Sequence, residues 1–203
     1  PGLILLEEKQ FQDLPKLQIG TRKFDHLYPS ALFFNGINAA IFLDTQWRAG
    51  AKIDIARDVS SSTVSDTSTW QKMFLGSSAL YLEYALRADK RTRIVGNIAA
   101  GILFLQFETQ VVWGNPAWSA VFEYPGNAHG MNSINTKAAF FFQPSIGLES
   151  LFTEQLIFRI SAGLLVSEIE KSAWQLNQSL PLADGADISL NQVFFQITIG
   201  MCR

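Results

Sequence analysis

Apolar residues alternate with small or polar residues along most of this chain, and the pattern is plainest near the C-terminal end. Within 190–201 one parity is apolar and the other is mixed: Val193, Phe195, Ile197, Ile199 and Met201 against Phe194, Gln196, Thr198 and Gly200. A period of two is that of an extended strand, whose successive side chains point to opposite faces. The chain is therefore expected to be built from strands with one apolar face and one mixed face.

Eight stretches carry this alternation and predict eight strands. They are 16–24, 31–42, 47–57, 71–86, 92–107, 137–149, 155–166 and 188–201, preceded by an N-terminal tail over 1–15. The even-numbered connections hold only four or five residues each, at 43–46, 87–91 and 150–154. After a modest first connection, the odd-numbered ones are long, at 60–69, 108–135 and 167–187. Short turns at one end and long loops at the other are typical of up-and-down antiparallel barrels in outer membranes.

The two parities differ in charge as well as in bulk. One parity carries Phe, Leu and Ile, and the other carries Gly, Ser and Ala with interspersed charges. The charged residues assigned to the second parity are Arg48, Lys52, Asp54, Glu83, Arg87, Glu149 and Arg159. An eight-stranded barrel has an interior just wide enough for side chains, so the bulky face would overfill it. The sequence therefore predicts an all-β, closed up-and-down antiparallel transmembrane β-barrel of eight strands over 16–203, with lipid on its apolar face. A soluble, lipocalin-like barrel with the faces reversed, carrying an apolar ligand, is the alternative.

Composition restricts the function classes. The formal net charge is −2 and no basic stripe is present, so a nucleic-acid partner is not expected. A single cysteine, Cys202, rules out an intrachain disulfide and a Cys-rich metal site. The sequence shows no phosphate-binding glycine loop, metal-ligand spacing or nucleophile elbow, so neither a metal nor another cofactor is expected.

Aromatic residues are concentrated in the two longest predicted loops. These residues are Trp113, Trp118, Phe122, Tyr124 and Trp174. Exposed aromatic residues at such density mark contact surfaces. We expect these loops to recognise either outer-membrane lipid or a partner membrane or surface protein.

The alternation, the three tight turns and the apolar closing strand resemble the small eight-stranded barrels of bacterial outer membranes, the OmpA-like and porin-like group. The segment 140–166 is similar to the hairpins of that group in Gram-negative bacteria. The resemblance implies location in the bacterial outer membrane. Members of the group usually end on an aromatic residue, whereas this chain ends Gly200-Met201-Cys202-Arg203.

The inventory of catalytic residues is small. Some outer-membrane barrels modify lipid A with a histidine, and here His26 and His129 both fall in predicted loops. Neither lies in the His-x-Ser pattern of the deacylases, so the sequence favours a structural or interaction protein over a lipid-modifying enzyme. The inward charges are interpreted as a salt-bridge plug in preference to the lining of a conduit.

Overall fold

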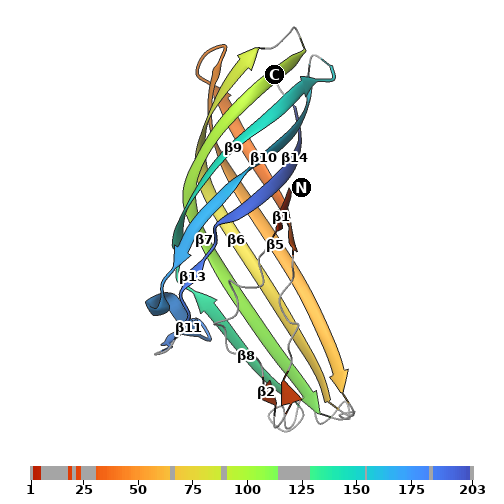
Figure 1. Ribbon diagram of the computed structural model, residues 1–203, viewed down its shortest axis with the longest axis vertical. Coiled ribbons are helices and arrows are strands. Elements are labelled where there is room, and N and C mark those ends of the chain that lie inside the picture. Colours follow the sequence, from red (N-terminus) through yellow and green to blue (C-terminus); the bar gives the residue numbers. More distant parts are fainter. Residues whose placement is uncertain are drawn as a thin grey trace.

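In the computed structural model the protein is all-β, and its sheets are antiparallel throughout (Figure 1). The structure describes residues 2–5, 18–19, 22–23, 31–64, 67–87, 91–113, 129–153, 155–182 and 185–201. No helix in these ranges is long and apolar enough to cross a membrane.

The longest strands belong to the main sheet. In chain order the main-sheet strands are β1 (Gly2–Leu5), β4 (Ala31–Phe42), β5 (Trp47–Val64), β6 (Thr67–Arg87), β7 (Thr92–Trp113), β8 (His129–Thr136), β9 (Ala139–Leu151), β10 (Leu156–Ile169), β11 (Trp174–Leu176), β12 (Leu180–Pro181), β13 (Ile188–Ser189) and β14 (Gln192–Met201). A short 3-10 helix, η2 (Lys171–Ala173), precedes β11. Seven of the eight predicted strands correspond to long strands observed here.

The pairing order follows the chain with few exceptions. Strand β4 pairs with β5, β5 with β6, and β6 with β7. Strand β9 pairs with both β7 and β10, and β10 pairs with β14. Strand β1 pairs with both β14 and β4.

The predicted first strand over 16–24 is wrong. The described residues of that range form β2 (Gln18–Ile19) and β3 (Arg22–Lys23), which pair with each other in a separate sheet. The place beside β4 belongs to Gly2–Leu5, which the sequence had assigned to a tail. Four residues of which three are Leu or Ile show no alternation, so the periodicity did not reveal this strand.

The strands continue far into two of the predicted long loops. The expected loop at 60–69 is wrong, because β5 and β6 stay paired up to Val64 and Thr67. Strand β7 has 22 residues, about 70 Å of extended chain at about 3.3 Å per residue. A membrane span needs only about 9–11 residues. In Figure 1 the lower ends of β5, β6 and β7 project well beyond those of β9, β10 and β14.

A smaller structure lies against this projection. Strand β8 pairs with the last part of β7, β11 pairs with β8, and β12 pairs with β11. We call β8, β11, β12 and 106–113 of β7 the ledge. The predicted loops over 108–135 and 167–187 are thus partly strands.

Pro144 lies in the middle of β9, and proline has no backbone N–H to donate to a ladder. The ladder between β9 and β10 contains Gly163↔Ser145 and Val166↔Phe142 but no pair at Pro144 or Gln143. The register is the same on both sides of this gap. The proline therefore interrupts the ladder to β10 without an inserted residue.

Candidate functional site: a buried ion network beneath an apolar surface

The inner face of the sheet is the one that carries Arg48. This face is concave, because Arg48 on β5 reaches Glu149 on β9 although β6 and β7 lie between those strands in the pairing order. Likewise Lys52 on β5 donates to the Gln143 side chain on β9. Contacts across two intervening strands require a strongly curved sheet.

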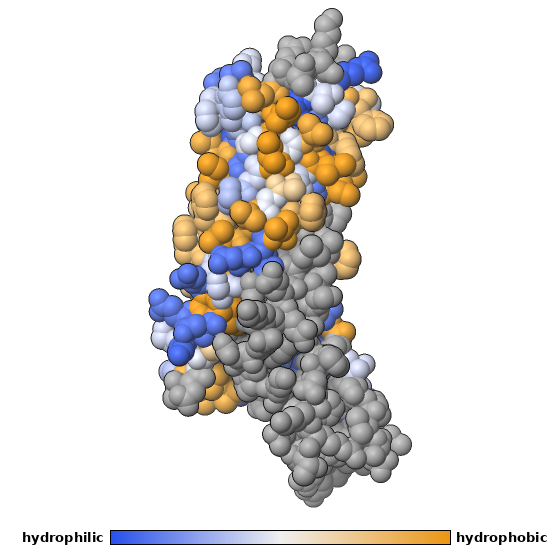
Figure 2. Space-filling view, in the orientation of Figure 1, coloured by the Kyte–Doolittle hydropathy of each residue, from blue (hydrophilic) through white to orange (hydrophobic). Residues whose placement is uncertain are grey.

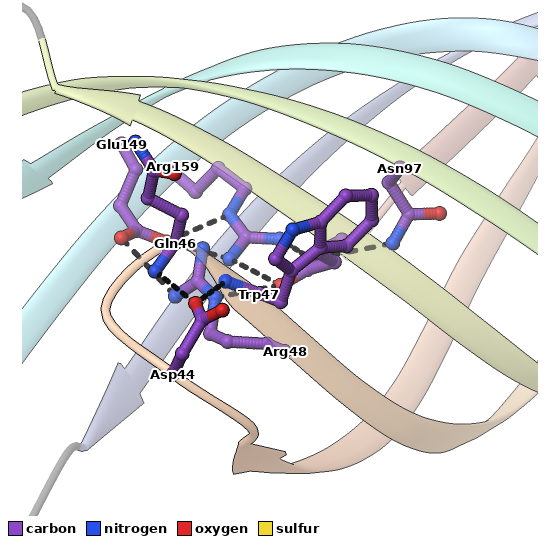
Figure 3. A network of polar contacts seen from close by, with 8 residues as sticks. Asp44, Gln46, Trp47, Arg48, Asn97, Glu149 and Arg159 are labelled. Carbon is purple, nitrogen blue, oxygen red and sulfur yellow. Dashed lines mark hydrogen bonds and ion pairs between the residues drawn. The ribbon is translucent and has the colours of Figure 1, made fainter.

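Four charged side chains meet on the inner face near the short-turn end. Arg48 follows the turn at 43–46, and Glu83, Glu149 and Arg159 lie close to the turns that join β6 to β7 and β9 to β10. Cross-strand register brings them together, since Arg48 is opposite Glu83 and Arg159 is opposite Glu149. The Glu149 side chain has no exposed surface and that of Glu83 has only 3%. Figure 3 shows the side chains of Arg48, Glu149 and Arg159 converging from different strands.

Each arginine contacts both glutamates. Arg48 Nη1 donates to Glu149 Oε1 at 3.2 Å, while its Nε lies 3.0 Å from Glu83 Oε2. Arg159 Nη2 donates to Glu149 Oε2 at 2.6 Å, and Arg159 Nη1 pairs with Glu83 Oε1. Asn97 Nδ2 adds a donor to Glu83 at 3.2 Å. Two positive and two negative groups therefore form a neutral, alternating network.

One part of the network has contact without good hydrogen-bond geometry. Nε and Nη2 of Arg48 are buried and make no geometrically acceptable hydrogen bond, although both lie 3.0 Å from a glutamate oxygen. Their contribution is therefore ionic attraction, and the directed hydrogen bonds come from Arg48 Nη1 and from Arg159.

A second, smaller charge pair lies further along the inner face. Lys52 Nζ lies 3.2 Å from Asp54 Oδ2, and both side chains are mostly buried. The Lys52 ammonium also lies 6.0 Å from the Phe141 ring centroid, a distance suited to cation–π attraction. Six of the seven predicted inward charges are thus placed in two groups, and the side chain of Arg87 is outside the described part of the structure.

Beyond these charges the inner face becomes apolar. Large buried residues fill it toward the projecting strands: Leu75, Leu103, Leu105, Phe141, Leu165 and Phe194. The sequence predicted an inner face of small and polar residues along its whole length, and that is wrong for this half. The residues of the inner face were assigned correctly, but along β9 they change from apolar at Phe141 to polar at Gln143 and charged at Glu149.

The outer face of the sheet carries exposed apolar side chains where the inner face carries buried charges. Large apolar side chains are exposed on each of the long strands: Ile37 and Ile41 on β4, Ile53 and Ile55 on β5, Leu80 and Leu82 on β6, Ile98 and Ile102 on β7, Ile146 and Leu148 on β9, Ile160 and Leu164 on β10, and Ile197 and Ile199 on β14. Figure 2 shows apolar surface over the end of the molecule opposite the projection. Soluble monomers rarely expose so many large apolar side chains on one face.

Aromatic and polar groups occur together at the short-turn boundary of this surface. The Trp47 and Tyr84 rings lie 4.8 Å apart, and Tyr84 Oη donates to Gln46 Oε1 at 3.3 Å. Asp44 Oδ1 accepts from the backbone N–H groups of Gln46 and Trp47 at 2.6 and 2.7 Å. These two hydrogen bonds hold the pKa of Asp44 below its usual value. The turn is thereby fixed next to aromatic side chains that suit a lipid–water interface.

Trp174 was predicted to belong to an exposed loop surface, and this is wrong. It is 1% exposed, its Nε1 donates to the Ala186 carbonyl at 2.6 Å, and its ring stacks on Phe107 at 6.1 Å. The reason is that β11 pairs with β8, so the segment folds back onto the sheet. The described part of the structure does not include Trp118, Phe122, Tyr124, His26 and Cys202, nor the side chains of Trp113 and His129.

No group of three or more His, Cys, Asp or Glu side chains in the described ranges is arranged to hold a metal ion. The chain matches no protein-family model, no curated protein and no solved structure.

Proposed function

We propose that this protein is an integral β-barrel of a bacterial outer membrane, similar in kind to the OmpA-like and porin-like barrels, and that it functions as a structural or interaction protein. The order of pairing supports closure into a ring of eight strands. Following the pairs from β4 through β5, β6, β7, β9, β10, β14 and β1 leads back to β4. A closed ring satisfies the backbone hydrogen bonds that hydrocarbon cannot.

The observation that carries the proposal is the inversion of the usual burial pattern. Arg48, Glu83 and Glu149 are at most 4% exposed, whereas Ile37, Leu80 and Ile146 are at least 63% exposed. Water on the outer face would leave this apolar surface hydrated, at about 25 cal/mol for each Å². Lipid on that face removes the cost and leaves the charges neutralised by one another inside.

The arrangement of the interior favours a plug over a pore. The neutral network spans the inner face at one end, and packed apolar side chains fill the other end. The cavity next to Leu75, Leu103 and Phe194, which Lys52 and Asp54 also line, measures about 30 Å³. Ligand pockets typically measure about 300–1,000 Å³, so the apolar half of the interior has no room for the ligand of the soluble-carrier alternative.

The ledge supports recognition outside the membrane. Trp174 belongs to the same buried cluster as the inner face, and Phe107 and Ile134 pack against that cluster, so the ledge is held against the sheet beside the connections next to it. One of these connections, between β7 and β8, contains the aromatic residues Trp118, Phe122 and Tyr124. We assign the ledge side to the cell exterior, where such barrels carry their longer connections. Outer-membrane lipid or a partner surface protein is the proposed partner.

Membrane fractionation combined with gel mobility tests the proposal. We expect the protein to sediment with the outer membrane, to resist extraction by alkaline carbonate, and to migrate differently before and after boiling in detergent. We also expect no large steady conductance in a planar bilayer. A protein found in the soluble fraction, with one mobility, would refute the membrane assignment.

A lipid-modifying enzyme is the second candidate, and the histidines allow a direct test. Replacing His26 and His129 with Ala should leave the acylation pattern of lipid A unchanged. Mass spectrometry of lipid A from cells with and without the protein would reveal an acyl-chain change, and loss of that change in the double variant would establish an enzyme.

A further inference from the structure

Strand β1 covers only part of the interval between β4 and β14. Gly2 is opposite Phe34 on one side and Gln196 on the other. Past that level, no strand among the described residues lies between 35–42 of β4 and 197–201 of β14. We call this interval the slot. In Figure 1, β1 is short, whereas β14 continues toward the end with the short turns.

The slot is open to the ion network. A groove of about 640 Å³ lies there, lined by Asn38, Phe42 and Thr198 and reaching Arg48, Glu83 and Arg159. Gly36, Asn38 and Ala40 share the inner parity of β4 but are exposed, whereas the inner residues Ala79 and Tyr81 of β6 and Phe141 and Gln143 of β9 are buried. Ile37 and Ile199 flank the slot on the outer face and are also exposed.

An open slot conflicts with a lipid environment. Backbone N–H and C=O groups along both edges would face hydrocarbon without partners, which spanning structures avoid. Hydrocarbon in the slot would also lie next to the charged network. One extended segment, hydrogen-bonded to both edges, would remove both problems.

We propose that the slot is filled by a segment of this same protein that continues β1 on its N-terminal side, ahead of Pro1. The proposal rests on the membrane barrel proposed above. Strand β1 is antiparallel to both neighbours and already hydrogen-bonds to both, with its N-terminal end directed into the slot. A strand from another molecule would have to stop directly against Gly2, whereas a continuous chain extends the existing ladders.

The register fixes the partners of such a segment. Each step back from Gly2 advances one residue along β4 and one along β14. The third residue before Pro1 therefore lies opposite Asn38 and Gly200. Four residues before Pro1 reach Met201, and seven reach Phe42. The first and third face inward and should be small or polar, and the second and fourth face outward and should be apolar.

Disulfide formation in the protein isolated from its native membrane tests the register. In a Cys202→Ser background, a cysteine at the third residue before Pro1 is combined with Asn38→Cys. Directly opposed residues have Cα atoms about 4.5–5.5 Å apart, within the range of a disulfide. The matched control is Ala39→Cys, the adjacent residue on the opposite face. We expect most of the Asn38→Cys protein and little of the control to form an intramolecular disulfide on mild oxidation.

Hydrogen exchange on the unsubstituted protein gives a second measurement. The amides of 35–42 should exchange at least tenfold more slowly in the isolated protein than in a chain beginning at Pro1. Equal cross-linking of Asn38→Cys and Ala39→Cys, equal exchange in the two chains, or a native N-terminus at Pro1 would each overturn the proposal. Recovery from the soluble fraction would instead contradict the membrane assignment, while the cross-link would still report on the slot.

Discussion

Replacing Arg159 with leucine tests the buried network most sharply. The substitution removes both contacts to Glu149 and both to Glu83, and leaves two carboxylates that share only Arg48. Glu149 and Glu83 side chains are 0% and 3% exposed, so water cannot readily solvate the uncompensated charge. Breaking a buried pair by removing one partner costs about 3–5 kcal/mol. We expect a loss of that size in the free energy of unfolding.

The assay is urea unfolding of the protein in lipid vesicles, followed by tryptophan fluorescence and by gel mobility without boiling. Arg159→Lys is the first control, because it retains the charge and loses the two-pronged geometry, and it should cost less. The second is Arg159→Leu combined with Glu149→Gln, which restores neutrality with Arg48 and Glu83. The double variant should recover about 1–3 kcal/mol relative to the sum of the single effects. Additive effects, or a cost below about 1 kcal/mol for Arg159→Leu, would refute the network as a stabilising plug.

Three further substitutions or titrations test other parts of the account. Ile160→Arg, on the outer face in mid-strand, should lower the free energy of unfolding by about 2–4 kcal/mol when the protein is refolded into vesicles. Its neighbour Ser161→Ala loses only a 3.5 Å hydrogen bond and should cost less than about 1.5 kcal/mol. Equal costs would mean that the faces are reversed. Trp174→Ala should destabilise the ledge by about 3–5 kcal/mol and make it sensitive to limited proteolysis. The gel mobility of the unboiled protein should be unchanged. A global loss of folding would show that the ledge does not unfold separately from the rest of the sheet. The pKa of Asp44, measured by NMR, should lie below 3.8, and Asp44→Asn should abolish this titration. Because the folded-state pKa is lowered, the turn hydrogen bonds should contribute fully at neutral pH and weaken as pH falls through that pKa; a midpoint at or above 3.8 would contradict the turn geometry.

The strands that cross the apolar surface could be predicted because each is amphipathic there. Strand β4 was predicted with its observed bounds, and Arg48, Glu83, Glu149 and Arg159 were assigned to one face from parity alone. Their mutual pairing follows from register, which is fixed by short turns such as 43–46. Sequence periodicity does not reveal which charges on non-neighbouring strands meet, so the Arg48–Glu149 and Arg159–Glu83 contacts were not predicted.

The projecting part could not be predicted for a related reason. Along 60–64 and 67–71 the residues are mostly Ser and Thr, so period-two contrast disappears although the ladder continues. Trp174 appeared to be an exposed loop residue because β11 has only three residues, too few for a pattern. Gly2–Leu5 was missed for the same reason. Pairing with an already formed strand places these short segments, and that information is not local.

The most direct test of the central claim is the environment of each residue along β9. Nitroxide labels, introduced one at a time, report contact with oxygen and with a water-soluble nickel complex in lipid bilayers. The labelled positions are Phe140, Phe141, Phe142, Gln143, Ile146 and Leu148. Exposure alternates along this strand, with Phe140, Phe142, Ile146 and Leu148 on the outer face. The account predicts oxygen accessibility at those four positions and low accessibility to both reagents at Phe141 and Gln143. High nickel accessibility at the four outer positions would contradict it, because the apolar face would then meet water.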